Sequence, residues 1–428
     1  MTMEKERNTP SIRFKGFTDP WEQQKLNNLC ELITKQTGFD YSATIKPSLV
    51  REKKTGVYPF IQNKDFSGNN INLDTDFYIP IEVAEKFPRI LLDKPSLLIS
   101  ISGRIGNVGL YNLPQKSFIG GAVGICKLKD HDVGEFVVQE LESEYGQRYF
   151  QSLIKASSHA NITVEDIRNI ELNMPSTRNE RQKISDFFLN LDILITLHQR
   201  KLDREKRLKE YLLQNMFPRE GENVPRIRFP GFTDPWEQRK LSEIATMHAR
   251  IGWQNLRTSE FLDDGDYYLI TGTDFTDGRI DFSHCHYVAK ERYEQDKNIQ
   301  IRNGSILITK DGTLGKVAYV SGLNKPATLN AGVFNVVIKD DEIDEKYLYQ
   351  YLAGHFLMDY VSQRATGGTI KHLNQNILID FPVLLSSYEE QKQIGSALEN
   401  IDNLITLHQQ KLESLKELKK GLLQKMFV

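Results

Sequence analysis

The chain has 428 residues, 39% hydrophobic and 26% charged, which is enough for two or three globular domains of ordinary composition. Its three cysteines lie far apart without zinc-ligand spacing, and no stretch fits a signal peptide or a membrane span, which predicts a reduced, cytoplasmic protein. The formal net charge of −2 argues against a free-standing nucleic-acid-binding domain, unless the basic residues gather on one face or a partner supplies charge.

The N-terminal segment, residues 1–26, contains a phrase that recurs later in the chain. Residues 10–26 read PSIRFKGFTDPWEQQKL and residues 225–241 read PRIRFPGFTDPWEQRKL, which agree at 14 of 17 positions at an offset of 215 (225 − 10 = 215). Both contain Asp-Pro-Trp-Glu, beginning at Asp19 and at Asp234. An Asp N-cap, a Pro at the first helical position and a Glu three residues after the cap predict a helix start in each copy.

The interior of each copy is predicted to be a mixed α/β domain. Short β-like runs such as 96–102 and 305–309 are separated by Gly and Asn. The first domain is expected in residues 27–175. The second is expected in residues 227–385 and opens with the repeated segment 227–241.

A long helix is predicted to follow each domain, in residues 176–217 and 386–428, with a polar linker bounded by Pro and Gly at 218–226. The helices share a second repeat: residues 194–202 read LITLHQRKL and residues 404–412 read LITLHQQKL, which agree at eight of nine positions. Apolar residues recur at alternating spacings of three and four, the pattern of a coiled coil. Because the duplicate supplies a partner helix, we expect the two helices to pack antiparallel.

These observations predict an α+β fold of two pseudo-symmetric mixed α/β domains, separated by two long helices packed as an antiparallel coiled coil. The residues expected at the helix interface are Leu191, Ile195, His198, Leu202, Ile401, Ile405, His408 and Leu412. His198 and His408 either face each other near the pseudo-two-fold axis or each reach solvent at the edge of the seam.

No catalytic motif is present. The sequence lacks a P-loop, a Gly-rich nucleotide loop and the Asn/Asp-Pro-Pro-aromatic motif of adenine methyltransferases, and capping explains its two Asp-Pro-Trp motifs. His284-Cys285-His286 resembles a metal cluster, but alternating residues on a strand give the same spelling, so we favour a structural role. No metal-binding residues are therefore predicted.

Two glycine motifs are candidate approach points for DNA. Residues 98–108 read LISISGRIGNV and residues 307–317 read LITKDGTLGKV, and glycine lets a backbone come close to a phosphate or a groove edge. Arg and Asn suit guanine and adenine edges, while Lys and Thr suit phosphates. The alternative is a tight hairpin turn with ordinary surface residues. The candidate DNA-binding residues of the two glycine motifs are Arg104, Asn107, Lys310, Thr313 and Lys316. Lys64 is a further candidate, and a second loop adds Arg250 and Trp253. For Trp253, the alternative is a place in the core.

The repeated phrases resemble those of the DNA-specificity subunits of bacterial type I restriction–modification systems. The resemblance rests on IRFPGFTDPWEQRKL at 227–241, on the repeat LITLHQ(R/Q)KL, on the ending LLQKMF at 422–427 and on the two glycine motifs, and it covers essentially the whole chain.

The resemblance implies a non-catalytic subunit with two target-recognition domains, each reading one half of a split, asymmetric DNA sequence. The helices would act as a ruler and dock two modification subunits that carry S-adenosylmethionine and methylate adenine at N6. Restriction subunits, which translocate and cut DNA, would bring ATP and Mg, so no cofactor and no membrane partner are expected for this chain. A coiled-coil adaptor without its own DNA readout is the alternative.

Overall fold

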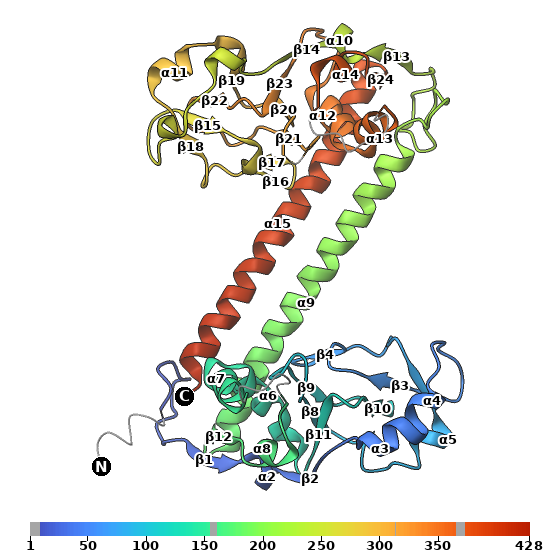
Figure 1. Cartoon of the computed structure of the whole chain (residues 1–428), viewed down its shortest axis with the longest axis vertical. Coiled ribbons are helices and arrows are strands. Elements are labelled where there is room, and N and C mark those ends of the chain that lie inside the picture. The colour runs from blue at the N-terminus through green and yellow to red at the C-terminus, as the bar shows by residue number, and fades with distance from the viewer. Residues whose placement is uncertain (1–8, 155–160, 313, 365–372) are drawn as a thin grey trace. The chain divides into compact units, whose positions relative to one another are not determined.

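The chain forms two compact units. Unit 1 consists of Met1–Arg200 and Gln409–Val428, and unit 2 consists of Lys201–His408. Both long helices contribute one part to each unit. The structure is a computed structural model, and it describes residues 9–154, 161–312, 314–364 and 373–428 (Figure 1).

In its described residues, unit 1 contains two four-stranded sheets and two short two-stranded ones, with helices packed beside them. Its elements, in chain order, are β1 (Glu22–Lys25), α2 (Leu26–Leu29), β2 (Cys30–Lys35), α3 (Gly38–Asp40), the π-helical turn η1 (Tyr41–Ile45), α4 (Lys46–Ser48), β3 (Val57–Ile61), β4 (Phe66–Ser67), β5 (Asn70–Ile71), β6 (Tyr78–Pro80), α5 (Ile81–Ala84), β7 (Leu91–Leu92), β8 (Ser96–Ser100), β9 (Val108–Tyr111), β10 (Ser117–Ile119), β11 (Val123–Leu128), η2 (His131–Val133), α6 (Gly134–Glu142), α7 (Glu144–Leu153), α8 (Val164–Arg168), β12 (Glu171–Met174) and the first part of α9 (Arg178–Asn215).

Unit 2 repeats this arrangement. Its elements are the rest of α9, β13 (Glu237–Lys240), α10 (Leu241–Ile244), β14 (Ala245–His248), η3 (Gly252–Gln254), η4 (Thr258–Glu260), β15 (Tyr268–Ile270), η5 (Gly272–Asp274), β16 (Phe275–Thr276), β17 (Arg279–Ile280), β18 (His286–Tyr287), α11 (Lys290–Glu294), η6 (Lys297–Ile299), β19 (Gln300–Ile301), β20 (Ile306–Thr309), β21 (Val317–Tyr319), β22 (Ala327–Leu329), β23 (Val333–Ile338), α12 (Glu345–Ala353), α13 (His355–Gln363), α14 (Gln375–Ile379), β24 (Pro382–Leu385) and the first part of α15 (Tyr388–Met426).

The strand order confirms the predicted duplication of a mixed α/β domain. One sheet has the order β2-β11-β8-β9 in unit 1 and β14-β23-β20-β21 in unit 2, and both are antiparallel. The other has the order β6-β3-β10-β7 or β18-β15-β22-β19, with one parallel pair in each, β3 with β10 and β15 with β22. Parallel neighbours need a crossover connection, which makes both domains mixed rather than simple meanders.

Strand β8 shows why the predicted β-like run is apolar on both faces. Successive side chains of a strand point to opposite faces of the sheet. Leu97 and Ile99 join the core around helix α6, whereas Leu98 joins a second core between the two sheets. All five residues of β8 are buried, including Ser96 and Ser100 at its ends, so both faces of the strand are covered.

The repeated Asp-Pro-Trp-Glu segments do not begin helices, contrary to the sequence prediction. Residues 22–25 and 237–240 are strands β1 and β13, which pair antiparallel with β12 and β24. Trp21 and Trp236 are buried just before these strands. Burial of the indole ring and pairing with a distant strand therefore override the local capping signal.

Buried ion pairs explain part of the repeated phrase. Arg13 Nε lies 2.5 Å from Glu180 Oε1, and Arg228 Nε lies 2.7 Å from Glu390 Oε1. The same guanidinium groups donate to the backbone carbonyls of Asp19 and Asp234. The repeated segment of each copy is thus fixed to the first turn of the long helix that follows its domain.

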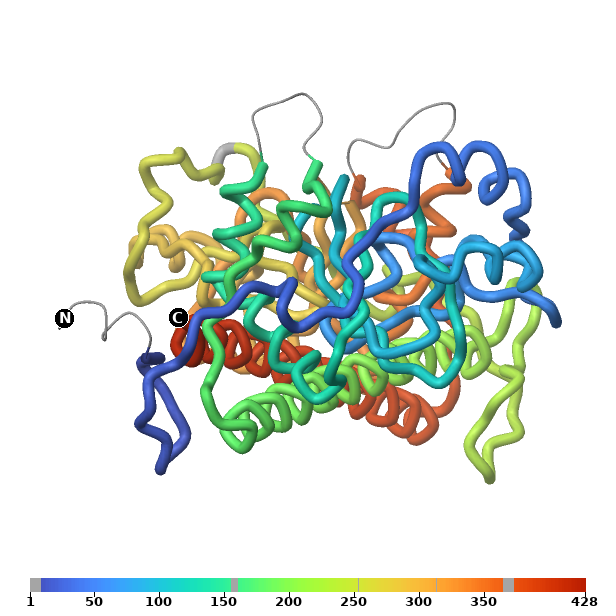
Figure 2. The backbone as a smooth tube through the Cα atoms, turned by 90° about the horizontal axis from the view of Figure 1, so that it is seen from below, coloured from blue at the N-terminus to red at the C-terminus, as the bar shows by residue number. Residues whose placement is uncertain are grey.

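The long helices run antiparallel within each unit. In unit 1, Lys419 Nζ of α15 lies 2.8 Å from Asp192 Oδ1 of α9, and Phe427 packs against Phe188, four residues before Asp192. In unit 2, Lys209 Nζ of α9 lies 2.6 Å from Asp402 Oδ1 of α15. Figures 1 and 2 show the two helices side by side, as the coiled-coil pattern predicted.

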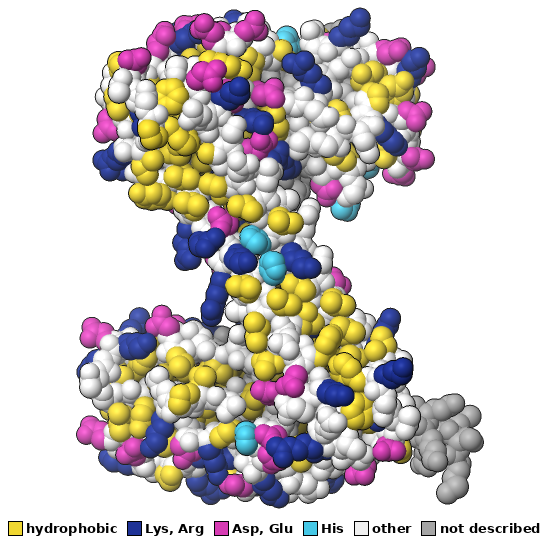
Figure 3. Space-filling view, turned by 180° about the vertical axis from the view of Figure 1, so that it is seen from behind, with side chains coloured by type: hydrophobic (Ala, Val, Ile, Leu, Met, Phe, Trp, Pro, Cys, Tyr) yellow, Lys and Arg dark blue, Asp and Glu magenta, His cyan; other side chains and the backbone are white. Residues whose placement is uncertain are grey.

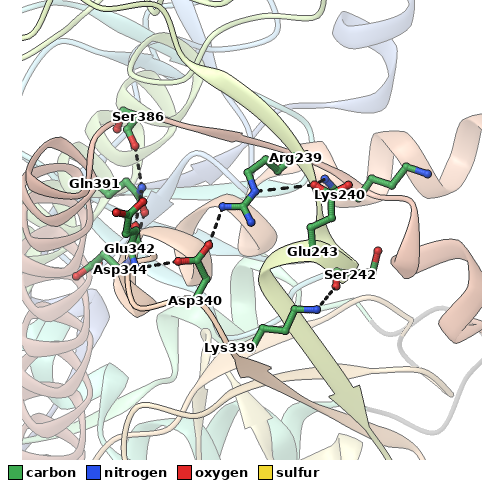
Figure 4. A network of polar contacts seen from close by, with 10 residues as sticks. All are labelled: Arg239, Lys240, Ser242, Glu243, Lys339, Asp340, Glu342, Asp344, Ser386 and Gln391. Carbon is green, nitrogen blue, oxygen red and sulfur yellow. Dashed lines mark hydrogen bonds and ion pairs between the residues drawn. The ribbon is translucent and has the colours of Figure 1, made fainter.

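A network of polar contacts fixes the start of α15 to unit 2 (Figure 4). Arg239 Nη1 of β13 lies 2.6 Å from Asp340 Oδ2, and Asp340 stands two residues after the end of β23. Gln391, in the first turn of α15, accepts a hydrogen bond from the backbone N–H of Asp344 and donates to the carbonyls of Glu342 and Ser386. The helix therefore leaves the domain in a defined direction.

All three cysteines are free and buried. Among the residues that the structure describes, no helix is both long enough and apolar enough to cross a bilayer.

Candidate nucleic-acid interface

The glycine motif of unit 1 forms a rigid loop between β8 and β9. Gly103 and Gly106 have φ values of +74° and +83°, in the left-handed region that favours glycine. Asn107 Nδ2 donates to the carbonyls of Asn63 at 2.9 Å and Phe66 at 2.7 Å. These two bonds occupy both N–H groups of the Asn107 amide, so this side chain holds the loop and has no donor left for a base.

Arg104 lies at the exposed tip of this loop. No hydrogen bond or ion pair joins its guanidinium to another described residue. The loop beneath it is fixed to α7, because Gln147 Nε2 donates to the carbonyl of Gly106 at 2.9 Å. Arg104 is therefore a charged side chain on a rigid support, which suits contact with a phosphate or a base edge.

The equivalent loop of unit 2 connects β20 to β21. Gly312 and Gly315 have φ values of +72° and +71°, so the backbone follows the same left-handed path as in unit 1. Lys316 is exposed, and Lys310 is half-buried with Nζ 5.4 Å from the centre of the Phe334 ring. The third candidate of this loop, Thr313, lies outside the described residues.

The remaining candidates fall in different environments. Lys64 is exposed and pairs with Asp76. The hydrogen bond to Asp76 raises the pKa of Lys64, so this group stays cationic. For Trp253, which belongs to the turn η3, the side chain lies outside the described part of the structure.

Arg250 does not have the exposed position that the sequence predicted. Its side chain is only 2% exposed, and its guanidinium donates to the carbonyls of Leu329 and Gln254 and to the Thr328 hydroxyl. A guanidinium enclosed in this way supports the loop that follows β14, and it has no path to a DNA groove. We therefore leave Arg250 out of the proposed interface.

The histidines and the cysteine of the His-Cys-His motif make local contacts. His284 Nδ1 lies 2.8 Å from Asp281 Oδ2, and the Cys285 thiol donates to the Asp281 carbonyl. Among the described residues, the one set of three potential ligands within reach of a common ion is Asp130, His131 and Asp132, which is largely exposed. Neither feature contributes to the candidate interface.

One exposed aromatic residue was missed by the sequence analysis. Phe39 is 80% exposed in a helical run, residues 38–48, where Thr37 Oγ1 caps the start by accepting from the backbone N–H of Asp40. Ser42 and Lys46 are exposed on the same face. The Phe39 ring is thus open to solvent at the start of a capped helical run, where it could stack on a base. Sequence alone gave no signal for it, because a single Phe is usually part of a core.

The predicted helix seam is buried or half-buried along its length. Leu191, Leu202, Ile401, Ile405 and Leu412 are buried, and Ile195, His198 and His408 are half-buried. His198 belongs to unit 1 and His408 to unit 2, so their face-to-face packing stays a prediction. The heptad pattern correctly identified the buried face of each helix.

Each helix also has a second apolar face, which is exposed. The exposed leucines occupy equivalent positions of the repeat, 210 residues apart (404 − 194 = 210), and are Leu194, Leu197 and Leu208 in α9 and Leu404, Leu407 and Leu418 in α15. Apolar side chains on the helix surface are visible in Figure 3. Because the seam already buries the other face, these leucines are available to a partner.

Both copies of the domain match one family model. The model describes the type I restriction modification DNA specificity domain, and it matches residues 18–205 and 233–417. This chain belongs to that family. Together the two matches span most of the chain, and each includes a domain, the whole of β1 or β13 and much of a long helix.

Curated relatives and solved structures agree with this assignment. The chain is 19% identical over 441 residues to the type I restriction enzyme MjaVIII specificity subunit of Methanocaldococcus jannaschii, covering 99% of this chain and 96% of that protein. It is 24% identical over 172 residues to the EcoBI specificity subunit of Escherichia coli, covering 39% of this chain and 35% of that protein. The crystal structure of the S subunit from M. genitalium shares the fold, with a TM-score of 0.67, 17% identity and coverage of 98% and 99%.

Proposed function

We propose that this chain is the non-catalytic specificity subunit of a cytoplasmic type I restriction–modification complex and reads a split, asymmetric DNA target with its two domains. The observation that carries the proposal is a duplicated domain whose frame is repeated and whose exposed loops differ. The domain limits predicted from the sequence, 27–175 and 227–385, are part of this proposal.

Differences between the two loops support an asymmetric target. The loop of unit 1 presents Arg104, whereas the loop of unit 2 presents Lys316 and the half-buried Lys310. Arg can contact guanine through two hydrogen bonds, while Lys offers a flexible point charge that suits phosphates. Two domains with the same backbone and different side chains would recognise different bases.

Helix length supports a target in two parts. Helices of 38 and 39 residues are about 57 Å long at 1.5 Å per residue. Proteins that read two half-sites on one face of DNA place their reading elements about one helical turn, roughly 34 Å, or more apart. Helices of this length can therefore separate two half-sites by an unread spacer.

The exposed leucines of α9 and α15 support docking of two modification subunits. Their repetition at equivalent positions would present the same surface twice, once to each of two identical partners. In this proposal the partners carry S-adenosylmethionine, methylate adenine and enclose the DNA, and restriction subunits supply ATP-dependent translocation with Mg. Charge from the partners would also offset the formal net charge of −2 of this chain.

The test is methylome sequencing of a host that expresses this chain with its modification partner. We expect N6-methyladenine in an asymmetric motif interrupted by a spacer of fixed length. Exchange of residues 27–175 for the domain of another specificity subunit should change one half of the motif and leave the other half and the spacer intact. Scattered methylation or a single unbroken motif would contradict the proposal. Absence of sequence-dependent binding with the partner present would favour an adaptor role.

A further inference from the structure

A cavity in unit 1 lies where the glycine loop meets the C-terminal part of α15. Its volume is about 630 Å³, and it is lined by the loop residues 104–108, by the start of α7 and by the last turns of α15. The basic residues in its wall are Arg104, Lys416, Lys419 and Lys420, and the acidic ones are Glu142 and Glu144.

Both acidic residues are already paired. Glu142 Oε2 lies 2.9 Å from Lys419 Nζ, which also contacts Asp192, and Glu144 pairs with Arg148. Glu142 and Asp192 thus neutralise Lys419 inside the fold. The remaining cations of the wall are Arg104, Lys416 and Lys420, and none of them forms an ion pair with an acidic group among the described residues.

Lys416 and Lys420 are four residues apart on one helix, so their side chains emerge from the same face. Both are exposed, and like charges at this spacing repel each other. Arg104 faces the same cavity from the loop, which Asn107 and Gln147 hold in place. Three cations from two rigid elements therefore converge on one cavity, an arrangement that favours a ligand with several negative charges.

The duplicate does not reproduce this cluster. At the shift of 210 that relates the helices, Lys416 corresponds to Lys206, but Lys420 corresponds to Glu210. In place of Gln147, unit 2 has Met358, whose sulfur lies against Gly315 of the loop. The cation cluster is a property of the first copy alone.

We propose that Lys416 and Lys420 bind phosphates of the DNA backbone beside the half-site that unit 1 reads through Arg104. This inference rests on the proposed function, because unit 1 must lie on DNA for a backbone to reach the cavity. Phosphate contacts contribute affinity without sequence information. The C-terminal helix thus takes part in DNA binding, and it holds the first half-site more firmly than α9 holds the second.

The experiment uses the full chain in complex with its modification subunits and compares the wild type with the double variant Lys416→Gln, Lys420→Gln. Dissociation constants are measured between 50 and 200 mM salt on a duplex with the methylated target motif and on one with a scrambled motif. The matched control is Lys392→Gln, Lys411→Gln, which removes two exposed lysines of the same helix outside the cavity.

Each lost phosphate contact lowers the slope of log affinity against log salt by about 0.9. We expect the slope of the double variant to fall by about 1.8, so its loss of affinity between 50 and 200 mM salt is about tenfold smaller than that of the wild type. Affinity at low salt should fall by the same factor on both duplexes, and the methylated motif should stay unchanged.

If the double variant Lys416→Gln, Lys420→Gln has the same slope of log affinity against log salt as the control variant, the inference is wrong. The proposed function is not affected by that result. A changed methylation motif overturns the inference as well, because the lysines would then contact bases. If ATP or inorganic phosphate binds the wild type and not the double variant, with an unchanged DNA slope, the ligand is a soluble phosphate compound and not DNA. Loss of all sequence-dependent binding in the wild-type complex would instead overturn the proposed function.

Discussion

The buried pair Arg228–Glu390 is expected to stabilise unit 2, and the variant Glu390→Gln tests its contribution. The Glu390 side chain is fully buried, and it accepts from Arg228 Nε at 2.7 Å and from Nη2 at 2.9 Å. Glutamine has nearly the same size, but it replaces one acceptor oxygen with an N–H group that would face the guanidinium. The variant therefore leaves Arg228, whose side chain is 12% exposed, with a positive charge that is buried and only half satisfied.

Breaking one side of a buried ion pair costs about 3–5 kcal/mol. For a unit of roughly 200 residues, each kcal/mol shifts the unfolding temperature by about 2–4 °C, so Glu390→Gln should lower it by roughly 6–20 °C. The assay is thermal unfolding measured by calorimetry. The transition that shifts in Glu390→Gln relative to the wild type is assigned to unit 2.

Glu389→Gln is the matched control, because Glu389 is the exposed neighbour on the same helical turn. It should shift the transition by about 1 °C or less, as surface substitutions do. The double variant Arg228→Leu, Glu390→Leu should recover much of the lost stability, because apolar pairs of similar volume often replace buried ion pairs without cost. If Glu390→Gln and Glu389→Gln unfold at the same temperature, the Arg228–Glu390 ion pair does not fix the repeated segment to the helix, which contradicts the prediction.

Four further variants test other parts of the molecule. Phe427→Ala should destabilise unit 1 by about 3–5 kcal/mol in denaturant titration, because the Phe427 ring is only 5% exposed and lies among aromatic neighbours. If the variant and the wild type unfold at the same denaturant concentration, the C-terminus is not part of the core. Burial raises the pKa of Glu140 above its ordinary value of 4.5, so its contribution to stability is complete below pH 4.5 and is lost as pH rises toward the folded pKa. Between pH 5 and 8, the free energy of unfolding should therefore fall less in Glu140→Gln than in the wild type. If the two curves of unfolding free energy against pH are parallel, the titration of Glu140 does not cause the loss of stability. Leu407→Ser should leave the unfolding temperature unchanged, because Leu407 is 58% exposed. The same variant should weaken binding of the modification subunit by about 10- to 100-fold in titration. If the affinity for that subunit is unchanged, the exposed leucine face of α15 is not part of the docking surface. Phe39→Ala should lower DNA affinity by about 5- to 100-fold in the same complex, whereas the exposed control Leu113→Ala should not, and equal effects would refute base stacking.

Periodicity and repetition predicted the features of the fold that depend on local pattern. The seam residues of α9 and α15 recur at helical spacing, so their burial could be read directly from the sequence. Strands β8 and β20 lie within the predicted runs 96–102 and 305–309. The duplication itself predicted two domains with one strand order, because a repeated frame folds in the same way twice.

Features that depend on distant partners could not be predicted. Arg250 is buried because the carbonyl of Leu329 and the hydroxyl of Thr328 accept its hydrogen bonds, and both lie almost eighty positions away. Capping signals at Asp19 and Asp234 were outweighed by pairing with β12 and β24, which also lie far along the chain. Asn107 has the donors of a base-reading side chain, but only the folded loop shows that two backbone carbonyls take them.

The division of both helices between the two units has a consequence for biosynthesis. The core of unit 1 includes Trp21 and Phe136 from the beginning of the chain and Met426 and Phe427 from its end. At about 5–20 residues per second, a ribosome needs roughly 11–46 seconds to proceed from residue 200 to the end of the chain. During this time the part of the core that Met426 and Phe427 cover in the complete chain stays uncovered. A nascent chain that stalls before Met426 would thus leave its earliest domain incomplete, open to proteases and chaperones, even though every residue of that domain's sheets has already been made.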